Sequence, residues 1–190
     1  MTGWIATVSA STTATSEMST STINDYATSV AEFYGVEPSD VVVSTAYEST
    51  GSLTLTIPDD LSEDELTDAV IASLAESLGV HPQDVGVTVD METGEVDFVI
   101  TSDTFGDAAS IAFDLDNYQY QDDITESIQN ALPLVTVDTF EPSAEVTASL
   151  EFTIDANDAD NDLTQAAWQS EQLLSDFDVT IESTTFFYYK

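Results

Sequence analysis

A run of aspartates near the end of the sequence is the first feature that could bind a metal ion. Its candidate ligands are Asp155, Asp158, Asp160 and Asp162. Counted from Asp158, the run supplies oxygen ligands at the first, third and fifth positions of an EF-hand calcium loop. The sixth position is Leu163 where that loop requires Gly, and the twelfth is Gln169 where it requires Glu. We therefore expect weak Ca²⁺ binding at most and no required cofactor.

Two further acidic clusters lie where helices are expected to begin. They consist of Asp59, Asp60, Glu63 and Asp64, and of Asp114, Asp116, Asp122 and Asp123. Carboxylates at such places accept hydrogen bonds from free backbone N–H groups and complement the helix dipole, for about 0.3–1 kcal/mol each. Helix capping is the favoured interpretation of all three clusters, and weak cation binding is the alternative. Diffuse uptake of Ca²⁺ by the whole surface is favoured over any single tight site.

The residues needed for catalysis are scarce. Paired carboxylates could act as acid and base in a glycosidase, but among 37 acidic residues some pairs reach a suitable separation by chance. His81 is the only histidine, and its place in a turn before Pro82 favours a structural role at a helix end. The chain has no cysteine, so metal sites of the His/Cys type are excluded. We expect no enzymatic activity.

The aromatic end of the chain, residues 186–189, is a candidate for assembly. In a strand, Phe186 and Tyr188 would share one face, and Phe187 and Tyr189 the other. One pair would then belong to the core. The other pair, or an unpaired sheet edge, could dock on a neighbouring molecule. Both interpretations stay open, and Phe187 and Tyr189 are the assembly candidates.

The net charge excludes several classes of partner. The chain has 190 residues, of which 37 are Asp or Glu and one, Lys190, is basic, which gives a formal charge of −36. Nothing in it can neutralise phosphate, so nucleic acids and anionic membranes are excluded as electrostatic partners. The hydrophobic content of 42% is too high for a disordered acidic tail. We expect a folded protein.

A folded body with this charge repels itself and needs screening from its surroundings. Salt, divalent cations or low pH could provide it, because salt shortens the Debye length, Ca²⁺ binds carboxylates, and Asp and Glu protonate near pH ~4. We therefore expect a secreted or secretory-vesicle protein, with a high-salt environment as the alternative.

The absence of Arg as well as internal Lys suggests resistance to proteases that cut after basic residues, with Lys190 as a candidate processing site. Neither a targeting segment nor an apolar membrane-spanning stretch is recognisable.

A repeated phrase organises the sequence. Gly-Val-x-Pro-x-Asp-Val-x-Val occurs at 35–43 and again at 79–87, each time after an amphipathic helical pattern and before a β-rich run. The Gly indicates the end of a helix, and the Pro prevents its continuation. The phrase resembles helix-to-strand junctions in acidic tandem modules of secreted or extrusive-organelle proteins of algae and protists. This resemblance implies an extracellular or vesicular structural role and transfers no site residue.

The periodicity predicts two tandem units, residues 1–101 and 109–190. The first has expected strands at 4–11, 41–48, 53–57, 85–89 and 96–100, and helices at 19–34 and 62–78. The second has expected strands at 111–115, 134–140, 146–154 and 179–188, with helices around 124–132 and 163–174. Each order is β-α-β-β-α-β, the ferredoxin-like arrangement, with an extra hairpin strand at 95–101 between the units. The predicted fold class is α+β with antiparallel sheets.

These observations favour a non-enzymatic, acidic structural protein. We expect it to self-assemble, or to pack with related acidic chains, under the control of Ca²⁺, other divalent cations or pH. A secretory-organelle matrix and an extracellular matrix fibre are the settings considered. The alternative is a soluble binding or adhesion module of a halophilic organism, in which the charge serves hydration.

Overall fold

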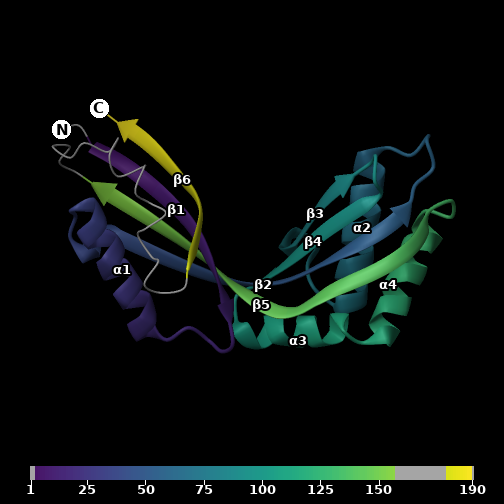
Figure 1. Cartoon of the computed structure of the whole chain (residues 1–190), viewed down its shortest axis with the longest axis horizontal. Coiled ribbons are helices and arrows are strands. Elements are labelled where there is room, and N and C mark those ends of the chain that lie inside the picture. Colours follow the sequence, from purple (N-terminus) through teal and green to yellow (C-terminus); the bar gives the residue numbers. More distant parts are fainter. Residues whose placement is uncertain (1–2, 157–178, 190) are drawn as a thin grey trace. The chain divides into compact units, whose positions relative to one another are not determined.

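The computed structural model describes residues 3–156 and 179–189. They form an α+β fold with an antiparallel sheet, which confirms the expected class at that level (Figure 1). The described strands are β1 (Gly3–Ala14), β2 (Val41–Thr56), β3 (Val85–Asp90), β4 (Glu95–Ser102), β5 (Thr136–Ala156) and β6 (Thr180–Tyr189). The described helices are α1 (Thr20–Tyr34), α2 (Glu63–Leu78), α3 (Phe105–Leu115) and α4 (Tyr118–Ala131), and 3₁₀ turns span Pro38–Asp40 and Pro82–Asp84.

Helices α1 and α2 begin and end as the sequence predicts. Ser19 and Ser62 cap their first turns, each accepting a hydrogen bond at Oγ from the backbone N–H three residues further on. Gly35 and Gly79 end the helices with φ at 68°, a left-handed conformation that glycine adopts without a Cβ penalty. The repeated phrase therefore has the same structural role twice: helix end, 3₁₀ turn and start of the next strand.

The chain divides into two compact units that are not consecutive in sequence. The inserted unit is Tyr47–Val146, and the flanking unit combines Met1–Ala46 with Thr147–Lys190. Strands β2 and β5 are long and contribute residues to both units. The strand order is β3-β4-β2-β5-β1-β6. The inserted unit thus uses β3, β4, β2 and β5, and the flanking unit uses β2, β5, β1 and β6.

This arrangement does not confirm the expected tandem units at 1–101 and 109–190. The sequence predicts two strands within 41–57, but the structure has the single strand β2 there. The strands expected at 134–140 and 146–154 are likewise parts of the single strand β5. The segment 95–101, expected as an extra hairpin strand, is β4 and lies between β3 and β2. The turn expected at residues 49–51 is therefore absent, and Pro142 lies inside β5.

Gly51 lies in the middle of β2 because a larger residue does not fit there. It pairs with Phe98 of β4, and a Cβ at position 51 would lie 2.5 Å from Cζ of that ring and 3.0 Å from Cα of Pro142. Phe98 is buried, and its ring contacts Phe140 with the centroids 5.8 Å apart. This glycine therefore marks a close approach inside a strand and not a turn.

Residues 111–115, expected as a strand, are helical. Thr104 accepts a hydrogen bond at Oγ1 from the Asp107 N–H and begins α3. The buried face of α3 has helical spacing and consists of Ala108, Ile111, Ala112 and Leu115. Three alternating apolar residues also fit a strand, but the wider helical pattern decides the structure. The buried Ser49 of β2 donates a hydrogen bond to the Ala108 carbonyl at 2.8 Å and fixes α3 to the strand.

Each unit has its own hydrophobic core. The core of the inserted unit contains the predicted stripes of α2 and α4, namely Leu66, Val70, Leu74, Ile124, Ile128 and Leu132. The core of the flanking unit combines Tyr26 and Val30 of α1 with residues of β1 and β5. The last predicted strand is confirmed as β6. The helix expected at 163–174 lies outside the described residues.

The contact at Gly51 gives a stability prediction. Gly51→Ala should lower the free energy of unfolding by about 1–3 kcal/mol, because the new methyl group overpacks against the buried Phe98 ring. The control is Gly106→Ala in the first turn of α3, whose Cβ would meet only Thr104 Oγ1 at 3.9 Å and should leave the free energy of unfolding unchanged or raise it by up to about 1 kcal/mol, because Ala favours a helix over Gly. Urea denaturation followed by circular dichroism measures both. Equal effects would contradict the close approach.

Candidate functional site

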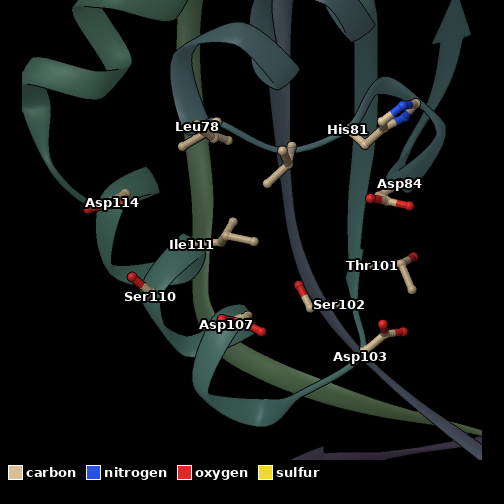
Figure 2. Close-up of a pocket in the computed structure, with 12 residues that line it drawn as sticks. Leu78, His81, Asp84, Thr101, Ser102, Asp103, Asp107, Ser110, Ile111 and Asp114 are labelled. Atoms are coloured by element: carbon tan, nitrogen blue, oxygen red, sulfur yellow. The ribbon is translucent and has the colours of Figure 1, made fainter.

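An acidic hollow of about 500 Å³ in the inserted unit is the candidate site. It lies where the end of α2, the following 3₁₀ turn, the end of β4 and α3 come together. Figure 2 shows Asp107 and Asp114 along α3, and Asp84 and Asp103 across the hollow from them. The four carboxylates line its wall, and the helix end before His81 closes one side. The hollow therefore has a negative potential and suits positively charged groups.

Two of the polar residues around the hollow have local structural roles. The Oδ2 atom of Asp107 accepts a hydrogen bond from Thr104 Oγ1 at 2.8 Å, and that hydroxyl caps the start of α3 in return. The Nδ1 atom of His81 accepts a hydrogen bond from the Gln83 N–H at 3.3 Å and caps the 3₁₀ turn. His81 therefore has a local structural role, but it caps the start of the 3₁₀ turn and not the end of the preceding helix as expected.

The carboxylates do not converge on one point. Within residues 3–156 and 179–189, no group of three or more His, Asp or Glu side chains is arranged to hold a metal ion. Lining residues such as Ser102, Ser110 and Thr101 add hydroxyl groups between the acids. The arrangement can attract a cation or a cationic side chain through solvent, and it presents no preformed coordination shell.

The predicted calcium candidates fall mainly outside the described structure. Asp155 lies exposed near the end of β5. Asp158, Asp160 and Asp162 lie outside the described residues, so weak Ca²⁺ binding at this run stays a prediction.

The structure places the assembly candidates on an edge strand. Phe187 and Tyr189 belong to β6, where their backbones pair with Ile5 and Gly3 of β1. In the strand order, β6 lies at one end of the sheet that the described residues form. The pairing has a bulge at Ser9 and Ala10, which locally increases the twist. Docking through these residues stays a prediction.

The capping interpretation is supported for one acidic cluster and wrong for part of another. Glu63 and Asp64 lie in the first turn of α2, as expected for carboxylates near a helix start. Asp114 and Asp116, however, lie at the C-terminal end of α3, and Asp116 is its C-cap residue. A helix dipole disfavours negative charge there. Asp116 also directly precedes Asn117, the N-cap residue of α4, and so still lies beside a helix start. Capping does not explain Asp114, nor Asp122 and Asp123, which lie beyond the first turn of α4.

Two exposed aromatic residues flank the same corner between α3 and α4. Phe113 on α3 is 73% exposed, and Tyr118 at the start of α4 is 82% exposed. The interpretation of 111–115 as a strand places Phe113 on the same face as Ile111 and Leu115, so it does not predict that Phe113 is exposed. The helical spacing of Ala108, Ile111, Ala112 and Leu115 is the sequence signal that would have placed Phe113 outside.

Comparison of the chain with protein-family models, curated proteins and solved structures finds no match. The resemblance to acidic modules of algae and protists therefore stays a prediction. Among the helices of the described residues, none is long and apolar enough to cross a membrane.

The cap at His81 can be tested by substitution. His81→Ala should lower the free energy of unfolding by about 0.5 kcal/mol, because the Gln83 N–H loses its acceptor. His81→Asn should retain wild-type stability, since Asn is a preferred capping residue with an acceptor oxygen. Thermal unfolding at neutral pH compares the three proteins. A loss that is equally large for Asn would contradict the capping role.

The hairpin between β3 and β4 should respond to acid through Asp90. Hydrogen bonds from the backbone N–H groups of Glu92 and Thr93 lower the pKa of this carboxylate. A lowered folded-state pKa means that the ionised form stabilises the hairpin at neutral pH, and this contribution disappears as pH falls through the lowered value. In an NMR titration, the Glu92 and Thr93 amide shifts should follow this protonation. In the Asp90→Asn control the local titration should be absent, and its persistence would contradict the assignment.

Proposed function

We propose that this protein is a non-enzymatic structural module that packs with copies of itself or with related acidic chains. Neutralisation of its carboxylates, by divalent cations or by protons, controls the packing. The setting that fits this behaviour is a secretory vesicle or the extracellular space, as a matrix or fibre component.

The observation that carries this proposal is the combination of charge and exposure. The formal charge is −36, and Lys190 is the only Lys or Arg in the chain. Within the described residues no Asp or Glu is buried, and the buried residues with polar groups in their side chains are serines and tyrosines. The negative charge therefore stands at the surface, where ions and protons reach it. Copies repel one another until that charge is reduced.

The strand order supports a repeated architecture. The inserted unit runs β2-α2-β3-β4-α3-α4-β5, with β4 between β2 and β3 and with β5 on the other side of β2. The flanking unit places β5 between β1 and β2, and β6 on the other side of β1. We infer that both are split βαβ units of the ferredoxin-like type, one inserted into the other instead of following it. The repeated phrase at Gly35 and Gly79 supports this, because it ends the first helix of each unit.

Sheet edges provide the contact surface in this proposal. Strands β3 and β6 lie at the two ends of the strand order of the described sheet. An edge strand offers backbone hydrogen-bonding groups to another molecule, and charge is one device that keeps such edges apart. Phe187 and Tyr189 of β6 are the proposed assembly residues.

Association should appear when the carboxylates are neutralised. At low ionic strength and neutral pH the protein should sediment as a monomer. Addition of about 1 mM Ca²⁺, or acidification towards pH ~4, should raise its scattering and sedimentation coefficient. Analytical ultracentrifugation and static light scattering measure this. A monomer that is unchanged under all these conditions would contradict the proposal.

Two controls separate the alternatives. Phe187→Ala combined with Tyr189→Ala should weaken association, whereas Val42→Ala combined with Leu134→Ala, which removes exposed apolar side chains elsewhere, should not.

A halophilic binding module predicts a different outcome. It would unfold in dilute buffer, and about 1 M NaCl would restore the fold without any association.

A further inference from the structure

We propose that the corner between α3 and α4 is a docking surface for an Arg- or Lys-rich segment of another protein. The surface is defined by the rings of Phe113 and Tyr118 and by the carboxylates of Asp114, Asp116, Asp122 and Asp123. It lies wholly in the inserted unit and does not depend on the self-association described above.

The exposed rings locate the surface. Phe113 is 73% exposed and Tyr118 is 82% exposed, while their neighbours Ile111, Leu115 and Ile124 are buried. The two aromatic residues stand on either side of the short link 116–117 between the helices. The hydrogen bond from the Asn117 N–H to the Asp114 carbonyl, 3.0 Å long, fixes this link. The rings are therefore presented by an ordered corner without serving the core.

The charges around the rings determine the kind of partner. Asp114 lies in the last turn of α3, where the helix dipole already provides negative potential, and Asp116 lies between this end and the start of α4. No Lys or Arg is available within the described residues to offset them. The end of a helix, carboxylates and the faces of aromatic rings each attract a cation. A second copy of this acidic chain would meet repulsion at the same place.

The neighbouring hollow extends the surface. Asp114 also lines the acidic hollow of about 500 Å³, with Asp107 on the same helix (Figure 2). An extended basic segment that crosses the corner could place one side chain over the rings and another in the hollow. Arg fits this surface particularly well, because its planar guanidinium both stacks on aromatic rings and pairs with carboxylates.

Binding of a labelled peptide by the full-length protein tests the proposal. The probe is a fluorescein-labelled Arg-Ser octapeptide at about 20 mM ionic strength, followed by fluorescence anisotropy, with a Glu-Ser peptide as the negative probe. Removing both rings by Phe113→Ala and Tyr118→Ala should raise the dissociation constant about tenfold. Tyr118→Phe, which keeps the ring, should bind as the wild type. Leu134→Ala, which removes another exposed side chain, should also bind as the wild type.

A matched pair of charge variants separates local docking from attraction to the whole surface. One variant converts Asp114, Asp116, Asp122 and Asp123 to Asn. The other converts Asp59, Asp60, Glu63 and Asp64 to the corresponding amides, which removes the same number of charges at the start of α2. The first should weaken peptide binding at least about fivefold more than the second. Circular dichroism confirms that each variant is folded.

Three outcomes would overturn the proposal. Equal weakening by the two charge variants would show diffuse attraction to an acidic surface. Unchanged peptide binding after removal of both rings would show that the aromatic residues take no part. Loss of self-association without loss of peptide binding in the ring variant would assign the corner to contacts between copies.

Discussion

Unbalanced negative charge is the constraint on which the rest of this molecule depends. Internal salt bridges from Lys or Arg cannot hold the fold, because Lys190 is the only such residue. Stability has to come from apolar burial, helix caps and hydrogen bonds between neutral groups. The structure reflects this: both cores of the described residues are almost entirely apolar, and one of the two buried serines, Ser49, donates a hydrogen bond to a helix carbonyl. Carboxylates lie outside, where water and ions solvate them.

The same constraint separates acids that serve the fold from acids that do not. At the start of α2, carboxylates complement the helix dipole, so local stability accounts for them. In the last turn of α3, Asp114 opposes it. The structure shows no stabilising contribution from a negative charge that opposes the helix dipole. Position along a helix, more than the number of acids, therefore supports the choice of the binding surface that we propose.

Local features of this fold could be predicted from the sequence, and long-range ones could not. Ser19, Ser62, Gly35 and Gly79 act through neighbours within one helical turn, so their caps are readable from spacing. The need for glycine at position 51, inside β2, comes from its pairing with Phe98, which lies far away in the sequence. The expected break between 48 and 53 was therefore wrong. The repeated phrase led to consecutive units, whereas the compact units are Tyr47–Val146 and the two segments that flank it. The interpretation of residues 111–115 as a strand likewise missed the exposure of Phe113. Its side chain lies on the face of α3 opposite to the buried residues.

Because one unit is inserted into the other in the sequence, the inserted unit is complete first during synthesis. As the chain emerges, β1 and α1 come first, but their partner β5 in the flanking unit arrives only after the whole inserted unit. Residues 47–146 have all their own strands by then and can close, whereas the flanking unit waits for a distant segment. Closure over such a separation is slow and leaves strand edges open to neighbouring chains. Strong like charge keeps nascent copies apart during that wait, so the property that opposes compactness also protects folding.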